Sequence, residues 1–591
     1  MATGSFFFIV GPSGAGKDSI LDGARAHLDP AHFVFAKRTI TRPASSGGEA
    51  HEACTPEEFA LREQQGAFLL TWQAHNLSYG LPSTLLEALH TGQHVLANGS
   101  RSMVAALKQR VPNLVVIEIS APAEVLAQRL AQRGRESAAD VAKRLSRTVE
   151  PYPTETVVLR VTNDQTPAIG VSRFLATLYT QLGQAPVALV SLYKKIAGLA
   201  LTEAEYRSLL SAINQKQHVG ADLEAFLIAC TQQLSDAELI AVARCRSALM
   251  PRISWSRDMV VDKHSLGGTP GSRVTMVVIP IVAAHGLLIP KTSSRAITSA
   301  AGTADAMEVL AKVDLTPEQL KKCVAQTNAC IAWNGKLNHS VIDDVMNALT
   351  RPLALDTRRW SVASILSKKY SAGATHVVID IPYSSGGKVK TKPEADALAQ
   401  TFETVGAALG LVVKAFATDG QAPIGRGIGP ALEARDVLQV LEGDLNAPAD
   451  LLEKSLFFAS QILALDPAVG NVAQGRVRAL DLLANGLAYA AMQKIIDAQG
   501  AQPVLDWFGV HKHEIRAPRG GRVQSIDGFF ISGLGRTAGA PADQRAGVDL
   551  ACGLGALVKQ GDLLYVLQAS DPGKLSQAVA LAQKDCGYVL S

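Results

Sequence analysis

Short apolar runs alternate with amphipathic helical patterns from residue 5 to about residue 183. The first run, SFFFIV at 5–10, is followed by a helical pattern, DSILDGARAHL, at 18–28. Such alternation is typical of parallel strands covered by helices. Glycine and proline in GQAP at 183–186 predict a domain boundary. The other predicted elements of this first domain are strands at 94–99, 113–120 and 157–161 and helices at 123–134 and 170–182.

The rest of the chain predicts regions of different texture. Residues 187–250 read as helices, one of them opening on a serine cap at SDAELIAVARCRSAL. Runs such as DMVVDKH, THVVIDIP and GLVVKAFATDG then indicate a second α/β region. We therefore predict an α/β multidomain chain with a parallel-sheet domain at 1–185, a helical domain at 187–250 and 340–372, an α/β domain at 251–339 and 373–505, and a small α+β unit at 506–591.

Composition narrows the class of protein. The 591 residues carry 57 basic and 53 acidic side chains, a formal net charge of +4, which gives no electrostatic footprint for nucleic acid. Apolar runs such as MVVIPIVAAHGLLIP are too short to cross a bilayer, and ATGS after Met1 is no export signal. Seven cysteines without a C-x-x-C pair or zinc spacing predict free buried thiols. We expect a cytoplasmic protein with neither membrane nor nucleic acid as partner.

A glycine-rich segment, GPSGAGK at 11–17, lies between the first strand and the first helix, where a P-loop belongs. Its glycines allow backbone N–H groups to face phosphate oxygens, and Lys17 can reach the transferred phosphoryl group as a catalytic residue. The predicted ATP-binding residues are Gly11, Pro12, Ser13, Gly14, Ala15, Gly16, Lys17, Asp18 and Ser19.

The residue after Lys17 departs from the usual P-loop. Asp18 stands where a serine or threonine commonly meets Mg²⁺, and Ser19 follows it. A carboxylate can orient a hydrated Mg²⁺, because hard oxygen ligands suit that ion. The sequence leaves Asp18 and Ser19 as alternative, indirect Mg²⁺ ligands.

Motifs beyond the P-loop carry a family resemblance. KRTITRP, YGLP, NGSR and the arginine-rich RLAQRGRESAADVAKRLSR resemble the guanylate-kinase-like P-loop kinases, and Gly-Lys-Asp-Ser is most similar to the ribose 1,5-bisphosphate phosphokinase family. The resemblance covers about residues 5–183. It implies transfer of the ATP γ-phosphoryl group to ribose 1,5-bisphosphate, giving phosphoribosyl pyrophosphate.

Arginines of this region suit an anionic acceptor. Arg38 and Arg42 would project from one face of an extended segment, and Glu49 and Tyr79 are further acceptor candidates. A lid closing on the triphosphate would neutralise charge in the transition state. The alternative for any one lid arginine is a solvated helix face. The lid candidates are Arg129, Arg133, Arg135, Arg144 and Arg147.

A second phosphate-handling stretch is DKHSLGGTPGSRVT at 262–275, followed by KTSSRAITSAAGTAD at 291–305. A lysine, several hydroxyls and close-approach glycines form a rational oxyanion cradle. With SILSKK, these motifs resemble the thymidine phosphorylase family and particularly its AMP phosphorylase-like branch, over about residues 187–591. The resemblance implies a pyrimidine-nucleoside-phosphorylase-type helical domain facing an α/β domain, and a homodimer through the helical domain.

The resemblance also implies roles for residues at matching positions. The implied phosphate ligands are Lys263, Ser265, Thr275, Ser293 and Thr303. The implied nucleoside or nucleotide contacts are Gly268, Ser294, Arg295, Ala296, Ile297, Thr298, Ser299, Ser364, Lys368 and Lys388. Asp356 falls where the AMP phosphorylase branch has its proton donor, whereas the thymidine-specific branch relies more on the histidine matching His264, and Lys263 supports the same reaction.

Two nearby patterns carry less weight. His511 and His513 have strand spacing but no further metal ligands, so we expect no metal there. GRGIGP at 425–430 does not match G-x-G-x-x-G and is interpreted as a turn of the scaffold. Ser364 and Lys368 lie four residues apart and should share a helix face.

Three functions are weighed. The leading hypothesis is a bifunctional enzyme in which phosphorolysis of a nucleoside 5′-monophosphate supplies ribose 1,5-bisphosphate to the kinase. Under this hypothesis the enzyme uses ATP with Mg²⁺ and inorganic phosphate as substrates and has no bound organic cofactor. The second is a thymidine or pyrimidine nucleoside phosphorylase unconnected to the kinase substrate, and the third is a chain with one non-catalytic, regulatory half.

Overall fold

The computed structural model describes most of the chain as two compact units, residues 1–233 and 234–591. Within them it describes residues 4–42, 51–74, 76–132, 151–164, 166–183, 187–215, 221–267, 269–296, 299–335, 342–343, 346, 356–503 and 508–591. Both units are mixed α/β structures with parallel sheets, as the sequence predicts. No helix in these ranges is long and apolar enough to span a membrane.

The first unit is built on a five-stranded parallel sheet in the order β2-β7-β1-β8-β9. Its central strand is apolar throughout because both faces are covered: Phe7 and Ile9 pack with helices α1 and α7, and Phe6 and Phe8 pack on the opposite face. The strands are β1 (Phe6–Val10), β2 (Phe33–Phe35), β7 (His94–Asn98), β8 (Leu114–Ser120) and β9 (Val157–Thr162). The helices are α1 (Lys17–Arg25), α3 (Leu85–His90), α4 (Val104–Arg110), α5 (Ala123–Gln132) and α7 (Pro167–Leu182).

A second, four-stranded sheet carries the acceptor candidates of this unit. Its order is β4-β3-β6-β5, with β3 (Thr39–Ile40), β4 (Glu52–Ala53), β5 (Phe68–Ala74) and β6 (Leu77–Pro82). Helix α2 (Pro56–Gln64) begins after a capping box in which Thr55 and Glu58 satisfy each other's backbone N–H groups.

The helical region predicted at 187–250 divides between the two units. Helices α8 (Val187–Ile196), α9 (Glu203–Asn214) and α10 (Ala221–Gln232) belong to the first unit, where α8 packs against α7. Helix α11 (Asp236–Ala248) belongs to the second unit and packs against α16 (Arg358–Ser371). The compact units therefore meet at 233/234 and not at the glycine and proline of 183–186, since α8 continues the packing of α7.

The second unit has a parallel sheet, β10-β13-β14, and a parallel pair, β11-β12. The apolar run 274–285 forms helix α12 (Val274–His285), which is buried in the core between these strands and a group of C-terminal helices. The strands are β10 (Val261–Ser265), β11 (Ile289–Ser293), β12 (Ala329–Trp333), β13 (His376–Tyr383) and β14 (Val412–Asp419). The remaining helices are α13 (Thr303–Glu308), α14 (Pro317–Thr327), α17 (Lys392–Ala408), α18 (Pro430–Glu442), α19 (Ala449–Leu463), α20 (Val472–Ala484) and α21 (Leu487–Gln499).

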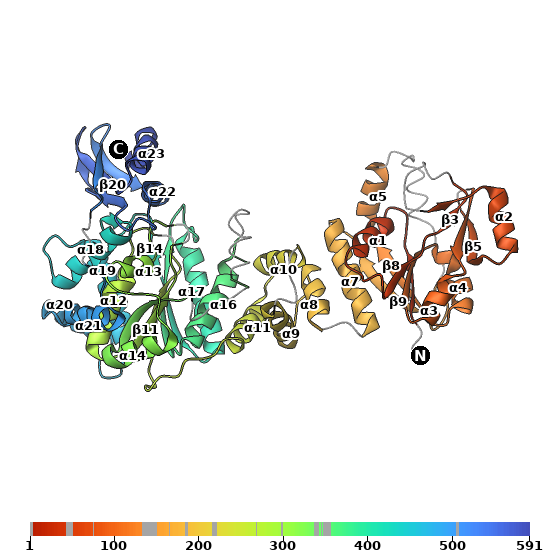
Figure 1. Cartoon of the computed structure of the whole chain (residues 1–591), viewed down its shortest axis with the longest axis horizontal. Coiled ribbons are helices and arrows are strands. Elements are labelled where there is room, and N and C mark those ends of the chain that lie inside the picture. The colour runs from red at the N-terminus through yellow and green to blue at the C-terminus, as the bar shows by residue number, and fades with distance from the viewer. Residues whose placement is uncertain are drawn as a thin grey trace. The chain divides into compact units, whose positions relative to one another are not determined.

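The C-terminal part combines strands and helices, with α22 and α23 beside β20 (Figure 1). One of its sheets includes β15 (Gly427–Ile428), which belongs to the GRGIGP turn and pairs with β18, so that the strand order is β15-β18-β20-β16. The other has the order β19-β17-β21. The elements are β16 (His511–Arg516), β17 (Gly521–Ile526), α22 (Gly528–Ala538), β18 (Gly547–Leu550), β19 (Leu557–Val558), β20 (Leu563–Ala569), α23 (Pro572–Lys584) and β21 (Tyr588–Leu590).

The cysteines correct one expectation. All seven are free thiols, but only Cys230, Cys245, Cys323 and Cys330 are buried. Cys54, Cys552 and Cys586 are partly exposed because they lie in turns and near strand ends.

Candidate active sites

The P-loop of the first unit has the geometry that its sequence context predicts. Gly14 and Gly16 have positive φ angles of 86° and 84°, and a Cβ on Gly16 would lie 2.5 Å from the Asn163 side-chain nitrogen. Helix α1 begins at Lys17, whose Nζ donates to the carbonyl oxygens of Gly11 at 2.8 Å and Pro12 at 3.2 Å. The lysine is thus held over the loop, at the helix end that attracts anions.

Asp18 and Ser19 follow on the first turn of α1, and both are exposed. The Asp18 carboxylate accepts a hydrogen bond from Asn98, the last residue of β7. A hard oxygen donor fixed beside the loop suits a hydrated Mg²⁺, so the donor set fits the ion. Ser19 has no such fixed orientation among the described contacts.

Arg129 is connected to the P-loop through Asn163. Its Nη1 donates to the Asn163 carbonyl at 2.8 Å, and Asn163 donates its amide to the Ala15 carbonyl at 2.8 Å. Asn163 was missed at the sequence level because nothing local marks a single asparagine after a strand. The other lid candidates, Arg133, Arg135, Arg144 and Arg147, lie outside the described residues, as do Glu49, Gly268, Ile297 and Thr298.

Arg38 and Arg42 have different neighbours on the small sheet. The Arg38 guanidinium lies 5.5 Å from the ring centroid of Tyr79 and 6.0 Å from that of Trp72. These rings stack 5.3 Å apart on paired positions of β5 and β6. Arg42 instead contacts His51, Nη2 to Nδ1, at 3.3 Å. Trp72 was missed, although a Trp opposite a Tyr on a hairpin is a readable signal.

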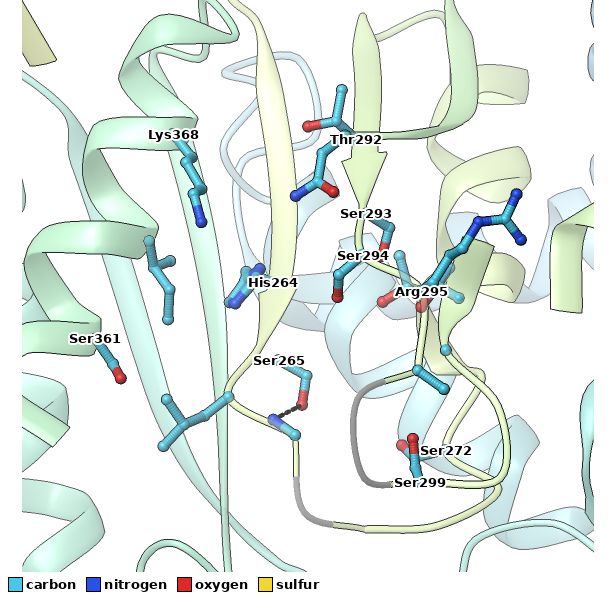
Figure 2. Close-up of a pocket in the computed structure, with 18 of the residues that line it drawn as sticks. His264, Ser265, Ser272, Thr292, Ser293, Ser294, Arg295, Ser299, Ser361 and Lys368 are labelled. Carbon is cyan, nitrogen blue, oxygen red and sulfur yellow. Dashed lines mark hydrogen bonds between the residues drawn. The ribbon is translucent and has the colours of Figure 1, made fainter. Parts of the chain in front are cut away.

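The second unit contains a pocket of about 770 Å³ that brings together residues from distant parts of the sequence. Figure 2 shows Lys368 and Ser361 on one side, Ser293, Ser294 and Arg295 on the other, and His264 and Ser265 between them. The predicted site residues that line the pocket are His264, Ser265, Thr275, Ser293, Ser294, Arg295, Ala296, Ser299, Thr303, Ser364, Lys368 and Lys388.

Lys263 and Asp356 do not line this pocket. Lys263 is buried, with Nζ 3.6 Å from Asp380 Oδ2 and 4.7 Å from the centre of the Phe458 ring. Burial lowers its pKa to about 8, although Asp380 favours the charged form. Ser265 donates to the same Asp380 oxygen at 3.0 Å. Asp380 therefore connects the buried Lys263 to Ser265, which lines the pocket.

The surroundings of Asp356 do not suit the role of proton donor that the resemblance implies. Its side chain is 57% exposed and forms a bidentate pair with Arg358, with contacts of 2.6 to 3.0 Å. These hydrogen bonds lower the pKa of the Asp356 carboxyl. A proton donor needs a raised pKa and contact with the leaving group, and this arrangement provides neither.

Ser364 and Lys368 share one face of α16, as predicted, and both contact Asp343. Ser364 donates to this carboxylate at 3.0 Å, and Lys368 Nζ lies 2.7 Å from Oδ2. Arg246 from α11 donates to both oxygens at 2.9 Å. Arg246 and Lys368 lower the pKa of Asp343 to about 2 against the opposing effect of burial. The predicted nucleoside contacts Ser364 and Lys368 are therefore anchored on one buried anion, Asp343.

His264 is surrounded by positive charge. Burial, followed by the charges of Lys369, Lys291, Lys263 and Lys368, lowers the pKa of its imidazole well below the usual range. Two of these lysines pair with Asp262: the Nζ of Lys291 lies 3.5 Å from Oδ1, and the Nζ of Lys369 lies 2.7 Å from Oδ2. The imidazole is therefore neutral at pH 7, with one ring nitrogen able to donate and the other able to accept.

The loop after β11 is fixed from two directions. Asp305 accepts hydrogen bonds from the backbone N–H groups of Ala296 at 2.6 Å and Gly302 at 2.8 Å. From α22, Ser532 accepts from the Ala300 N–H at 2.9 Å, and Arg536 donates to the Ser299 carbonyl at 3.1 Å. The C-terminal part thus holds a wall of the pocket, which Phe529 and Ser532 also line.

Comparisons with known proteins identify the family. The glycosyl transferase family, a/b domain, matches residues 257–489. A bifunctional ribose 1,5-bisphosphokinase–thymidine phosphorylase of Cupriavidus pinatubonensis is 53% identical over 98% of this chain and 97% of that protein. The chain belongs to this bifunctional family. A relative of the same name from Azorhizobium caulinodans is 47% identical over 100% of this chain and 97% of that protein. A solved structure, anthranilate phosphoribosyltransferase from Thermus thermophilus, matches at 16% identity and a TM-score of 0.43 over 52% of this chain and 99% of that one.

Membership of the bifunctional kinase–phosphorylase family confirms the double resemblance of the P-loop region and the KHSLGG region. The structure adds residues in or beside the pocket that the motifs did not include. Asp343 lies 21 residues before Ser364, which donates to it, and Asp380 lies 115 residues after Ser265, which donates to it. Phe529 lines the pocket from the C-terminal part of the chain. Their identity as lone carboxylates or a lone aromatic gives no local signal, so only the fold reveals them.

Proposed function

We propose that this chain is a bifunctional transferase, a ribose 1,5-bisphosphate phosphokinase joined to a phosphorylase of the thymidine phosphorylase family. The observation that carries the proposal is the match over 98% of the chain to a relative named for both activities. Two separate phosphate-type sites, one in each compact unit, support it.

In the kinase half, the P-loop would hold ATP and Lys17 would stabilise charge on the transferred phosphoryl group. Asp18, oriented by Asn98, would hold hydrated Mg²⁺. Arg38, Arg42 and Tyr79 would bind ribose 1,5-bisphosphate, and the product would be phosphoribosyl pyrophosphate. Arg129 would connect a lid to the P-loop through Asn163.

In the phosphorylase half, Ser265, Thr275, Ser293 and Thr303 would hold inorganic phosphate as the nucleophile. Phosphate attacks the anomeric carbon as the glycosidic bond lengthens, and the departing base gains negative charge. Lys368 and Ser364 would contact the base edge and stabilise that charge. We assign Lys263 a supporting role through Asp380.

Two groups are candidates for stabilising the departing base, His264 by a hydrogen bond and Asp356 by proton transfer. His264 lines the pocket and is neutral, so a ring N–H can donate a hydrogen bond. Asp356 would act only after its pair with Arg358 opens and the pocket closes around substrate. The geometry favours His264 in the arrangement described.

The domain arrangement also belongs to the proposal. For the phosphorylase half we propose a helical domain of 187–250 and 340–372, of which 187–233 belongs to the first compact unit of this structure, an α/β domain of 251–339 and 373–505, and a C-terminal domain of 506–591. A cytoplasmic homodimer formed through the helical segments fits the family resemblance.

A second candidate substrate for the phosphorylase half is a nucleoside 5′-monophosphate. Its phosphorolysis would release ribose 1,5-bisphosphate, which is the kinase substrate named in the relatives. Lys388, an exposed lysine at the pocket whose Nζ donates to the Leu266 carbonyl at 3.0 Å, offers a cation for the 5′-phosphate. Arg295 is less suited, because Glu308 and Asp305 already neutralise it.

The test is a substrate panel on the full chain. Thymidine, thymidine 5′-monophosphate, AMP, CMP and UMP are each supplied with phosphate, then with ATP and Mg²⁺, and free base and phosphoribosyl pyrophosphate are measured. Lys17→Ala should abolish only kinase activity, and Lys263→Ala should lower only phosphorolysis. Absence of free base from every substrate, or of phosphoribosyl pyrophosphate when ribose 1,5-bisphosphate is supplied, would refute the corresponding half.

A further inference from the structure

Arg273 is a buried cation of the pocket that the sequence motifs did not single out. It lies at the N-terminal end of α12, two residues before the phosphate candidate Thr275 of that helix, and is 8% exposed. Its Nη1 donates to the Thr303 hydroxyl at 3.3 Å, and Thr303 is itself a phosphate candidate. Arg273 therefore lies among the hydroxyls that would surround phosphate.

A buried carboxylate holds the other edge of this guanidinium. Glu433, in the first turn of α18, pairs with the Arg273 Nε and also accepts from the Gly429 N–H at 3.2 Å. Both side chains of the pair are buried. A guanidinium has five N–H donors in a planar fork, so anchoring Nε leaves the opposite edge directed at Thr303.

The GRGIGP turn explains how Glu433 comes to this position. Asp436 accepts from the backbone N–H groups of Arg426 and Gly427, both at 2.7 Å, and so closes the turn onto α18. The turn docks on the segment before Arg273, because Ile424 donates to the Pro270 carbonyl at 3.1 Å. Gly271 permits this approach: its φ is 70°, and a Cβ would lie 2.4 Å from the Ile424 carbonyl oxygen.

We infer that Arg273 binds the attacking phosphate and that Glu433 is its positioning residue. The inference rests on the proposed phosphorolysis. The pocket-lining phosphate candidates Ser265, Thr275, Ser293 and Thr303 are all neutral hydroxyls, and Lys263 lies behind Asp380. A phosphate dianion needs a charged donor as well. Lys291 and Lys369 also line the pocket but pair with Asp262, whereas the Arg273 guanidinium already donates to the phosphate candidate Thr303.

The test compares Arg273→Gln, Arg273→Lys and Glu433→Gln in the full chain, by steady-state phosphorolysis with phosphate and nucleoside varied in turn. Arg273→Gln is expected to raise KM for phosphate by roughly 10- to 100-fold, the effect of losing a hydrogen bond to a charged group. KM for the nucleoside and the kinase activity of the same chain should stay within about twofold, because neither substrate contacts Arg273. Arg273→Lys should recover part of the loss, and Glu433→Gln should raise KM for phosphate by roughly 3- to 10-fold.

Arg435→Lys is the matched control for loosening of α18. Arg435 lies two residues after Glu433 and pairs with Asp549 at 2.7 Å and Asp436 at 2.7 Å, but does not line the pocket. An equal rise in KM for phosphate in this control, or no rise in Arg273→Gln, would overturn the inference. Phosphate-dependent stabilisation in thermal unfolding gives an independent readout. If wild type is stabilised by phosphate but does not cleave nucleosides, the proposed function fails, and loss of that stabilisation in Arg273→Gln still supports this inference.

Discussion

Replacing Asp343 with asparagine tests whether the base side of the pocket depends on one buried charge. Asp343→Asn keeps the shape of the side chain and removes its negative charge. Arg246, whose side chain is 2% exposed, and Lys368, at 27%, would then lose their shared counter-charge. Ser364 would keep a hydrogen-bond partner, so the main change is electrostatic.

The size of the effect follows from the pKa of Asp343, which falls from 3.8 to about 2 in the folded state. Since one pKa unit corresponds to about 1.36 kcal/mol, the surroundings favour the charged form by roughly 2 kcal/mol. Removing one partner of a buried ion pair commonly costs about 3–5 kcal/mol. We therefore expect Asp343→Asn to destabilise the 234–591 unit by about 2–5 kcal/mol. Because the folded pKa is the lower one, this stabilisation is present above pH 4 and is lost as pH falls toward 2.

Denaturant unfolding followed by phosphorolysis activity, with kinase activity measured in the same samples, provides the assay. The midpoint for phosphorolysis should fall while that for the kinase is unchanged, and KM for the nucleoside should rise roughly tenfold because Lys368 loses its counter-charge. The matched control is Asp356→Asn, which breaks an exposed carboxylate–arginine pair and should cost less than about 1 kcal/mol. If both variants shift the midpoint equally, the reasoning about a buried charge is wrong.

Other substitutions test separate parts of the two sites. Asp18→Asn should raise the Mg²⁺ concentration for half-maximal kinase activity, and an unchanged Mg²⁺ titration would leave Ser19 as the candidate. Since burial lowers the pKa of Lys263 from 10.5 to about 8, the unfolded chain binds more protons between these values and stability rises with pH there. Lys263→Met should remove about 3 kcal/mol of that rise in denaturant titrations at pH 8 and 10.5, and identical slopes would refute it. Phe529→Ala should raise KM for the nucleoside roughly tenfold with KM for phosphate unchanged, and unchanged kinetics would place Phe529 outside the substrate contacts.

The sequence predicted the parts of each site that depend on consecutive residues. The P-loop follows a strand, bends at glycines and starts a helix at Lys17, so its geometry depends on residues that are consecutive in the sequence. Residues following β10 and β11 were likewise expected in one site, and both segments line the pocket. The place of Lys263 could not be predicted, because it depends on Asp380, a residue 117 positions later on β13. The division into compact units at 233/234 follows from the packing of α7 against α8, and this helix–helix packing has no signature in the sequence as strong as glycine and proline.

The two proposed sites would hold phosphate by different physical means, and this explains which of them the sequence reveals. The P-loop relies on backbone N–H groups and a helix end, so glycines mark it. The second site relies on side chains whose charges are set by carboxylates behind the pocket: Asp262 holds Lys291 and Lys369, Asp380 holds Lys263 and Ser265, and Glu433 holds Arg273. All three carboxylates are buried. Asp262 and Asp380 each lie near two lysines that would otherwise repel one another, whereas Glu433 pairs with Arg273 alone and burial raises its pKa to about 7. Changes to these carboxylates should therefore alter phosphate affinity without removing any group that touches phosphate, whereas the backbone donors of the P-loop stay in place when a neighbouring side chain is replaced.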